Sequence, residues 1–471
     1  MSAPASPVVT RIAPSPTGSM HIGNARAALF NRLYARHCGG RFLLRIEDTD
    51  RQRHSEAAVK VIFESLEWLG LETDGEPVFQ FSRSDIHRDI AHRLVATGHA
   101  YRCYLTPEEA EVAKRLARED GHALRSLWRD RAPGPDEVGK PHVLRFRVPD
   151  TGETIVEDVI RGAVRFPNKD LEDLVLLRSD GAPTYNLAVT VDDHDMGITH
   201  VIRGEEHLSN AARQVLIYGA MEWTAPAFAH LPLIVGADGA KLSKRHGAQS
   251  VGEFADMGYL PEALRNYLAR LGWGHGDDEI FTDEQAIAWF DLKDVVRAPA
   301  KLDLVKLAHI NNHYIRAADD VRLTNLVLDG LARRGFPIPP GADRRLMAVI
   351  PLVKEGAKTV LDLVELVIFA LKARPLKLDE RTVAELTDET RARLQRLSMV
   401  LAAQEDWGPA ALASRLRSFA DAEGVGLGRI GPALRGLLSG GSPAPDLAGA
   451  LSALGREEGL GRLEDALSRL H

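Results

Sequence analysis

The sequence predicts an α/β domain with a parallel sheet, followed by a mostly α-helical C-terminal part. Near the start, a β-branched run at residues 8–12 and an apolar run at residues 41–46 flank a stretch of helical periodicity at residues 21–38. A strand, a helix and a strand in such close succession form a βαβ unit, which favours a parallel sheet with ligands at the carboxyl ends of its strands. From residue 251 onward strands are hard to find and helical periods dominate.

The α/β part is interrupted in its middle. Amphipathic helices are predicted at residues 57–69 and 85–97, and residues 101–201 then mix a polar helix with short alternating segments. This change of texture indicates an inserted α+β domain. The elements expected in the insertion and after it are the helix 107–119, the segments 143–148 and 162–166, the strand 199–202, the helix 209–220 and the strand 231–235.

The C-terminal part is predicted to be helical, because helical periods alternate there with Pro and Gly punctuation. Helices are expected at residues 261–271, 300–311, 321–334, 360–371, 387–404, 408–422 and 447–470. The organisation gives five expected domains: 1–100 and 201–250 as the two halves of the α/β domain, 101–200 as the insertion, and 251–320 and 321–471 as helical domains.

Composition and charge exclude several classes of protein. With 471 residues, of which 45% are hydrophobic and 27% charged, the chain has the balance of a globular protein with several domains. It has no run of about eighteen apolar residues, so we expect a cytoplasmic protein without a membrane span. The two cysteines, Cys38 and Cys103, can form neither a disulfide framework nor a four-cysteine zinc site. We therefore expect no structural metal.

The net charge of −7 argues against nonspecific wrapping of nucleic acid, but it leaves a specific RNA partner open. Arginine is dense at residues 333–334, 344–345, 391–396 and 415–417. Any one such cluster is most often a solvated helix face paired with neighbouring acids. The four clusters together are stronger evidence for a specific RNA partner than any one of them is alone.

Two short segments far apart in the sequence are suited to hold a triphosphate from two sides. Residues 14–24 pair a glycine turn with a helix start, where N–H groups and the helix dipole attract phosphate and His21 can donate a hydrogen bond. Residues 241–245 carry two lysines beside a glycine turn, which suits charge that develops in a transition state. Taken singly, Ser19 is an ordinary helix cap and the lysines form a solvated turn. Together the segments favour adenylate chemistry.

The acidic pair Asp192 and Asp193, followed by His194 and Asp195, resembles a metal site at first sight. Adjacent carboxylates point apart on a strand, however, and no second ligand cluster has a supporting spacing. A structural or substrate-orienting role is therefore the favoured interpretation.

The motifs give the chain a resemblance to class I aminoacyl-tRNA synthetases, and most closely to bacterial glutamyl-tRNA synthetases. Residues 21–24 (HIGN) stand where the class has HIGH, and residues 241–245 (KLSKR) where it has KMSKS. More specific are residues 11–18 (RIAPSPTG), 45–50 (RIEDTD) and 199–207 (THVIRGEEH). The resemblance runs essentially the full length. It implies a Rossmann-like catalytic domain, an inserted acceptor-stem domain, a helical stem-contact domain and an α-helical anticodon-binding domain.

Glutamate carries two carboxylates and one ammonium, so its pocket needs cations or strong donors and one acid. The resemblance implies that Arg11 and Tyr185 hold the side-chain carboxylate, while Arg203 holds the α-carboxylate. Glu47 would hold the ammonium, and Ala13 and Ser15 would line the site. Arginine suits this role because its fork meets a carboxylate bidentately.

The resemblance also implies ATP as substrate and Mg²⁺ as its companion ion. The expected catalytic residues are His21, Lys241 and Lys244. The expected ATP-binding residues are Pro14, Thr17, Gly18, His21, Gly23, Asn24, Glu206, His207 and Lys244.

The implied reaction joins glutamate and ATP into glutamyl-adenylate and then passes the glutamyl group to the terminal adenosine of tRNA(Glu). Two alternatives stay open: that the chain also or instead charges tRNA(Gln) for later amidation, or that it is a catalytically silent tRNA-binding paralogue. The expected partners are tRNA, glutamate and ATP, and the expected state is a monomer. Candidate anticodon contacts are Trp407, Arg417 and Arg435.

The chain departs from the pattern in three places. Asn24 replaces the last histidine of HIGH, and Arg245 replaces the last serine of KMSKS. Many bacterial relatives bind zinc through a Cys-x-Cys and a later Tyr-x-Cys, of which residues 101–105 keep only Cys103. We therefore expect no zinc.

Overall fold

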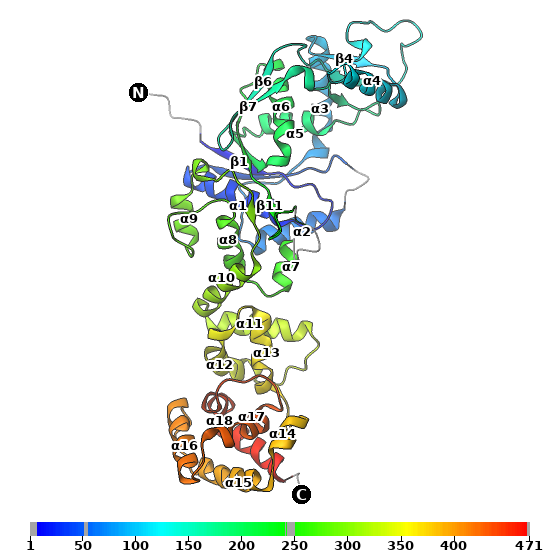
Figure 1. The fold of residues 1–471 in the computed structure, drawn as a ribbon. Helices are drawn as coiled ribbons and strands as arrows, with labels where there is room; N and C mark the ends of the chain where they lie inside the picture. The colour runs from blue at the N-terminus through cyan, green and yellow to red at the C-terminus, as the bar shows by residue number, and fades with distance from the viewer. Residues whose placement is uncertain (1–6, 51–54, 241, 243–249, 469–471) are drawn as a thin grey trace. The chain divides into compact units, whose positions relative to one another are not determined.

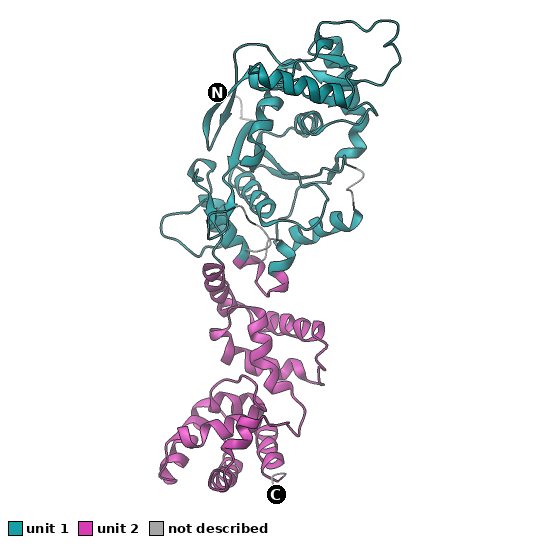
Figure 2. Ribbon diagram, turned by 45° about the vertical axis from the view of Figure 1, so that its right-hand side comes forward, with its two compact units in different colours: residues 1–254, 264–303 teal, residues 255–263, 304–471 magenta. Residues whose placement is uncertain are grey.

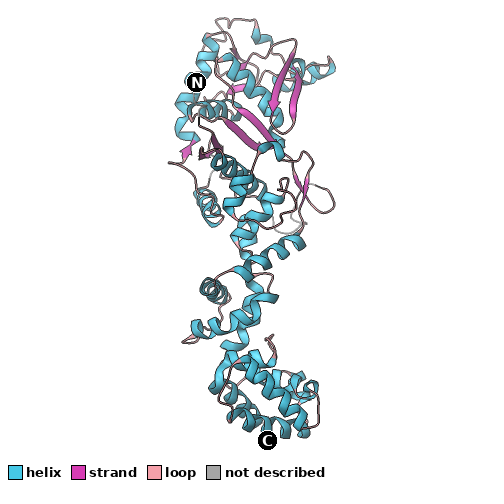
Figure 3. Cartoon of the chain, turned by 90° about the vertical axis from the view of Figure 1, so that its left-hand side faces the viewer, coloured by secondary structure: helices cyan, strands magenta, loops and turns pink. Residues whose placement is uncertain are grey.

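The structure is a computed structural model that describes residues 7–50, 55–240, 242 and 250–468. The chain separates into two compact units (Figure 2). The first unit comprises residues 1–254 and 264–303, and the second comprises residues 255–263 and 304–471. Within the described residues, every strand lies in the first unit (Figure 3). The finer division into five domains stays a prediction.

The βαβ unit expected from the sequence is present at the start of the first unit (Figure 1). Strands β1 (Val9–Ile12), β2 (Arg41–Ile46) and β3 (Val78–Phe79) are parallel, and helix α1 (Ile22–His37) connects the first two. After α1 the chain turns at Gly39, whose φ of 63° is a conformation that glycine adopts without strain. Because the strands are parallel, their carboxyl ends meet at one edge of the sheet.

Strands β9 (His200–Gly204) and β10 (Ala227–Leu231) extend this arrangement, with helix α6 (Leu208–Ala220) between them. They are parallel to each other, and β9 lies beside β1, since the Thr199 N–H donates to the Val9 carbonyl over 2.9 Å. The two halves of the α/β domain thus come together across these strands.

The strand predicted at residues 231–235 is wrong in its bounds. Pro232 has no N–H to donate and follows directly on the end of β10. A separate short strand, β11 (Ile234–Val235), pairs in parallel with β12 (Ala300–Lys301). The second pairing also explains why the helix predicted at 300–311 begins only at Leu304.

The segment between β3 and β9 contributes two antiparallel elements. Strands β4 (Ala100–Cys103), β5 (Val143–Phe146) and β8 (Val175–Leu177) form one antiparallel sheet. Strands β6 (Glu153–Asp158) and β7 (Gly162–Pro167) form a hairpin, and β6 also pairs in parallel with β10. The hairpin of the inserted segment is therefore continuous with the parallel strands.

Helix α5 (Tyr185–Asp195) corrects one expectation, because Asp192 and Asp193 lie on a helix and not on a strand. The β-branched run at residues 189–191 favours a strand by propensity alone. Its residues are buried inside the core of the first unit, together with Leu187, and tertiary packing overrides the propensity. On a helix the two neighbouring carboxylates point to different sides.

Helix α3 (Ser84–Ala96) adds Ala91 and Leu94 to this core. The first unit also contains α2 (Glu56–Trp68), α4 (Pro107–Glu119) and α9 (Asp283–Trp289), while α7 (Val251–Asp256) and α8 (Pro261–Arg270) span residues of both units. The second unit consists of α10 (Leu304–Ala317), α11 (Asp320–Arg333), α12 (Ala342–Val353), α13 (Val360–Leu371), α14 (Glu380–Glu385), α15 (Asp388–Ala402), α16 (Pro409–Ala422), α17 (Gly431–Ser439) and α18 (Leu447–Ser468).

The sequence missed α12, α14 and α17. Pro351 lies inside α12, and Pro432 and Gly436 lie in α17, so both stretches read as helix-breaking. Proline is tolerated in the first turn of α17, because the N–H groups there have no partner within the helix. Thr382 packs so closely on α17 that a Cβ at Gly436 would lie 2.1 Å from its hydroxyl oxygen. Glycine is therefore required by packing.

Candidate functional site

The predicted site residues of the first unit come from the carboxyl ends of neighbouring strands. Arg11 lies near the end of β1, Glu47 follows β2, and Arg203 lies near the end of β9. Tyr185 opens helix α5. This edge of a parallel sheet is where α/β proteins bind ligands.

A buried ion cluster holds the first of these side chains. Asp193 accepts two hydrogen bonds from Arg11, from Nε over 2.9 Å and from Nη2 over 3.1 Å, and a third from Arg45 Nη1 over 2.6 Å. Arg45 Nη2 also donates to Glu47 Oε1 over 3.1 Å. The side chains of Arg11, Asp193 and Arg45 are at most 4% exposed. Each charge therefore has an opposite partner inside the protein.

The surroundings shift the pKa values of the Asp193 and Glu47 carboxyl groups in opposite directions. Burial works to raise the pKa of Asp193, but the Arg11 and Arg45 guanidiniums outweigh it and hold that pKa at about 2. For Glu47, burial prevails over the same two arginines and raises the pKa above its ordinary value. Asp193 is thus a buried anion that anchors Arg11 and Arg45.

Asp192 faces a second cluster on the other side of α5. It accepts hydrogen bonds from Gln80 Nε2 over 2.9 Å and from Arg83 Nε over 2.6 Å, and it lies 2.8 Å from His87 Nε2. These partners fasten α5 to helix α3 and the turn before it. Among residues 7–50, 55–240, 242 and 250–468, no group of three or more His, Cys, Asp or Glu side chains is arranged to hold a metal ion.

Arg203 is buried and held on two of its nitrogens. Nε donates to His230 Nε2 over 3.2 Å, and Nη2 donates to Gln214 Oε1 over 2.9 Å. Nη1 is buried without a hydrogen-bond partner in the described part of the chain. Burial lowers the pKa of Arg203 from its ordinary value. An unpaired buried guanidinium nitrogen is costly, so the site fits an anionic ligand.

Tyr185 and His207 complete this end of the site. The tyrosine hydroxyl lies 3.2 Å from His207 Nδ1. Burial raises the pKa of Tyr185 to about 12, and the charges of Glu47 and Arg203 also act on it. Burial, together with the Arg203 charge, lowers the pKa of His207 to about 4. At neutral pH both side chains are uncharged, and the tyrosine keeps a proton to donate.

His21 caps helix α1, where the sequence left Ser19 open as the cap. Its Nδ1 accepts a hydrogen bond from the Gly23 N–H over 3.0 Å. In the neutral ring the proton then lies on Nε2, which becomes a donor. A Cβ at Gly23 would lie 3.2 Å from that Nδ1, so a side chain there would crowd the cap. The absence of a side chain at Gly23 therefore leaves room for the His21 ring to cap the helix.

The second phosphate segment is only partly within the described residues. Lys241 and Lys244 lie outside them, as does Arg245. Just beyond, Ser250 forms an antiparallel bridge with His21, and the Val251 N–H donates to the Met20 carbonyl over 3.0 Å. The chain thus returns to the start of α1 directly after this segment.

The remaining predicted ATP and glutamate contacts lie in the loop between β1 and α1, in the first turn of α1, or in the turn after β9. Ala13 is half-buried and Pro14 is buried, and the Pro14 carbonyl accepts from the Glu47 N–H over 3.0 Å. The exposed members of the loop and of the first turn of α1 are Ser15, Thr17, Gly18 and Asn24, while Gly23 is half-buried. Glu206 is exposed beside His207. The roles of these residues stay predictions.

Sequence reasoning missed Arg45, His230 and Gln214 as members of the site. Arg45 was visible inside the 45–50 motif, but its charge partner Asp193 lies 148 residues away. His230 and Gln214 carried no local signal. Cys103, the one cysteine left of the zinc pattern, is buried with its Sγ 3.3 Å from Ser126 Oγ.

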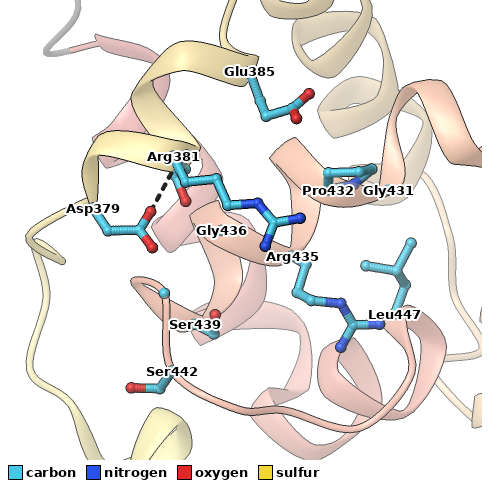
Figure 4. A pocket seen from close by; sticks show the side chains of 12 residues that line it. Asp379, Arg381, Glu385, Gly431, Pro432, Arg435, Gly436, Ser439, Ser442 and Leu447 are labelled. Carbon is cyan, nitrogen blue, oxygen red and sulfur yellow. Dashed lines mark hydrogen bonds between the residues drawn. The ribbon is translucent and has the colours of Figure 1, made fainter.

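The second unit contains a pocket of about 380 Å³ between α14 and α17 (Figure 4). Arg381 and Arg435 reach into the space drawn there, and Asp379, Ser439 and Ser442 also line it. Arg435 Nη1 donates to the Ala444 carbonyl over 3.0 Å, which fixes the side chain against the following loop.

Of the three candidate anticodon residues, only Arg435 lines this pocket. The Trp407 indole N–H donates to the Gln404 carbonyl over 3.0 Å, and its ring packs on Gly459. Arg417 is exposed on α16. Trp407 is therefore engaged in packing, and the pocket does not bring the three side chains together.

Known proteins resemble this chain over nearly its whole length. Residues 7–309 match the family model of the catalytic domain of class I tRNA synthetases (E and Q), and residues 322–467 match an anticodon binding domain. The chain is 62% identical to the glutamate–tRNA ligase of Phenylobacterium zucineum (strain HLK1), over 99% of each chain. It is also 62% identical to that of Caulobacter vibrioides, over 98% of each chain.

Solved structures agree with these relatives. A glutamate tRNA ligase from Elizabethkingia meningosepticum, crystallised in complex with its amino acid, matches with a TM-score of 0.85 and 33% identity. The match covers 99% of this chain and 100% of the other.

None of the described helices has the length and apolarity that crossing a membrane requires.

Proposed function

The chain belongs to the class I tRNA synthetases for glutamate and glutamine and ligates glutamate to tRNA, and we propose that the buried site around Arg203 and Glu47 binds the glutamate. One observation carries this proposal. Arg203 Nη1, a buried cationic donor without a partner in the described structure, shares its surroundings with the Glu47 carboxylate and the Tyr185 hydroxyl. Donors on one side and an acid on the other match the charges of an amino acid.

In the proposed pocket Arg203 Nη1 meets the α-carboxylate and Glu47 meets the ammonium. Asp193 engages Nε and Nη2 of Arg11, so Nη1 is left to meet the side-chain carboxylate beside the Tyr185 hydroxyl. The bidentate partner of Arg11 is thus a protein carboxylate, and the ligand is contacted end-on. This arrangement orients the α-carboxylate for attack on the α-phosphate of ATP.

We propose that ATP lies along the start of α1. The His21 Nε2 proton and the helix dipole favour a phosphate there. Lys241 and Lys244 would supply positive charge to the pentavalent transition state. Mg²⁺ is commonly bound through the phosphates of a nucleotide and needs few protein ligands. Mg²⁺ therefore stays a prediction.

The lysine role has a direct test. Replacing Lys244 by alanine should lower the rate of glutamate activation on the order of a hundredfold or more, because it removes charge needed mainly in the transition state. The glutamate KM should stay nearly unchanged. A large rise in that KM with an unchanged rate would contradict the role.

For the nucleic acid we propose tRNA(Glu), with an anticodon nucleotide entering the pocket around Arg435. Its volume suits a nucleotide, and Arg381 and Arg435 offer guanidiniums for a base edge or a phosphate. Neither charging of tRNA(Gln) nor a silent tRNA-binding role gains support from the relatives.

Aminoacylation of purified tRNA(Glu) and tRNA(Gln), measured in parallel with glutamate and ATP, tests these proposals. Charging of tRNA(Glu) alone is expected. Charging of tRNA(Gln) would establish the broader specificity, and charging of neither would refute the assignment. Replacing Arg435 by glutamine should raise the KM for tRNA(Glu) without changing the KM for glutamate.

Three simpler expectations accompany this function. We propose that the protein acts in the cytoplasm, where tRNA and ATP are available to it, and that it is a monomer, which sedimentation would check. We also propose that it holds no zinc. Stoichiometric, tightly bound zinc in a metal assay of the purified protein would overturn that expectation.

A further inference from the structure

A buried chain of hydrogen bonds runs from Asp158 through His230 to Arg203. Asp158 ends β6, His230 lies on β10, and in the sheet register His230 stands opposite Arg203 on β9. His230 Nδ1 lies 2.6 Å from Asp158 Oδ2, and Nε2 lies 3.2 Å from Arg203 Nε. Asp158 is 4% exposed, His230 0% and Arg203 7%. The neighbouring strands β6, β10 and β9 thus bring all three side chains together in a buried position.

The partners fix the tautomer of His230. Arg203 Nε can only donate, so His230 Nε2 must accept, and the ring proton lies on Nδ1, where it is donated to Asp158. Burial lowers the pKa of His230 even though the hydrogen bond that it donates to Asp158 opposes this shift. The imidazole is therefore neutral at pH 7, and it does not repel the guanidinium it touches.

Asp158 is itself held rigidly by its own hairpin turn. Its Oδ1 accepts from the Ile160 N–H over 3.0 Å and from the Arg161 N–H over 2.8 Å, and its Oδ2 accepts from the His230 N–H over 3.1 Å. These bonds keep it ionised, because burial raises the pKa of Asp158 but His230 and the backbone donors lower it further.

We propose that His230 and Asp158 are positioning residues for the α-carboxylate of glutamate, because they hold the Arg203 guanidinium with Nη1 turned to the substrate. The proposal rests on the assignment of Arg203 made above. Gln214 holds Nη2 from the other side, over 2.9 Å. With Nε and Nη2 engaged, Nη1 is the buried nitrogen left for a ligand. The inserted segment, which supplies Asp158, thereby shapes the amino-acid site as well.

Two substitutions at His230 separate positioning from packing. In His230→Asn the amide can still donate to Asp158 but is too short to accept from Arg203 Nε, so the glutamate KM should rise about tenfold or more. In His230→Gln the amide oxygen reaches the place of Nε2, and the KM should return to within a few-fold of wild type. The KM for ATP should stay unchanged in both variants.

His87→Asn is the matched control, because His87 is also fully buried and also paired with a carboxylate, Asp192, over 2.8 Å. It should lower the midpoint of thermal unfolding while leaving the glutamate KM unchanged. If His230→Asn does not fold, Asp158→Asn takes its place, since it keeps the shape of the side chain and removes its charge. A severalfold rise in the glutamate KM is then expected.

Arg203→Ala makes the two possible failures distinguishable. If this variant binds glutamate as the wild type does, the assignment of Arg203 is wrong. If it raises the glutamate KM and His230→Asn does not, the positioning role is refuted while the assignment stands. In the Arg203→Ala background, His230→Asn should raise the KM no further. An additional rise of similar size there, or an equal defect in His230→Gln, would show a packing role and overturn the proposal.

Discussion

Two arginine–aspartate pairs in this protein have the same geometry and different surroundings. Arg11 meets Asp193 through Nε at 2.9 Å and Nη2 at 3.1 Å, and Arg374 of the helical unit meets Asp465 through the same nitrogens at the same distances. The side chains of the first pair are 4% and 3% exposed, and those of the second 32% and 29%. Contact distance alone therefore says little about what a pair does.

The buried pair belongs to a network of charged side chains that balance one another, whereas water can balance the charges of the exposed pair. Asp193 also binds Arg45, which binds Glu47, so the loss of one partner leaves charges without solvent or protein to balance them. Water can replace either partner of Arg374 and Asp465. The difference teaches that the buried network can fix the geometry of the proposed glutamate site, while an exposed pair such as Arg374 and Asp465 should modulate stability only slightly.

The largest expected effect is on stability. Asp193→Asn should lower the free energy of unfolding by about 3–5 kcal/mol, because Arg11 loses its carboxylate partner and Arg45 keeps only Glu47. Asp465→Asn, the matched change at the surface, should lower it by less than about 1 kcal/mol. Urea denaturation followed by circular dichroism measures both. Equal losses in the two variants would mean that burial does not make the Arg11–Asp193 pair more important for stability than the Arg374–Asp465 pair.

Next in size is the effect on substrate binding. Glu47→Gln should raise the glutamate KM on the order of ten- to a hundredfold, since it replaces a charged acceptor for the ammonium by a neutral one. Arg374→Gln should leave this KM unchanged. Steady-state aminoacylation at varied glutamate concentrations gives both values, and a normal KM in Glu47→Gln would remove this residue from the pocket.

A smaller effect is expected from pH. The folded pKa of Asp193 is about 2, below its unfolded value, so its contribution is complete above about pH 4 and is lost as the pH falls towards 2. Glu47 acts in the opposite sense, because its folded pKa is raised. The difference in unfolding free energy between wild type and Asp193→Asn isolates the first group. It should shrink by roughly 2 kcal/mol between pH 5 and pH 2, and a constant difference would contradict the assigned shift.

The smallest effect is expected from salt. A double-mutant cycle on Arg374 and Asp465 should give a coupling below about 1 kcal/mol, and 1 M NaCl should reduce it further. The coupling of Arg11 with Asp193 should change little, since buried pairs are poorly screened. Similar salt sensitivity of the two couplings would mean that solvent reaches the buried network.

Much of the fold could be predicted from the sequence, because it depends on local patterns. The β1–α1–β2 unit, helix α4 and most C-terminal helices follow from hydrophobic period and from Pro and Gly punctuation. The convergence of Arg11, Glu47 and Arg203 follows from the parallel sheet, whose strand ends share an edge. The arginine clusters were also correctly interpreted in part, since Arg334, Arg393 and Arg396 pair with Glu365, Glu389 and Glu423.

What the sequence could not predict depends on distant partners. Asp193 meets Arg11 across 182 residues, and His230 meets Asp158 across 72, so neither contact leaves a local pattern. Helix α5 was missed because its β-branched residues favour a strand by propensity and become helical only in the packed core. These are the residues that fix the arginines of the site.

A crystal structure with bound glutamate would test the central claim most directly. We expect the α-carboxylate within hydrogen-bonding distance of Arg203 Nη1 and the ammonium beside Glu47, with the bonds from Arg203 to His230 and Gln214 intact. A glutamate whose α-carboxylate lies away from Arg203 Nη1, or whose ammonium meets another acid, would contradict it.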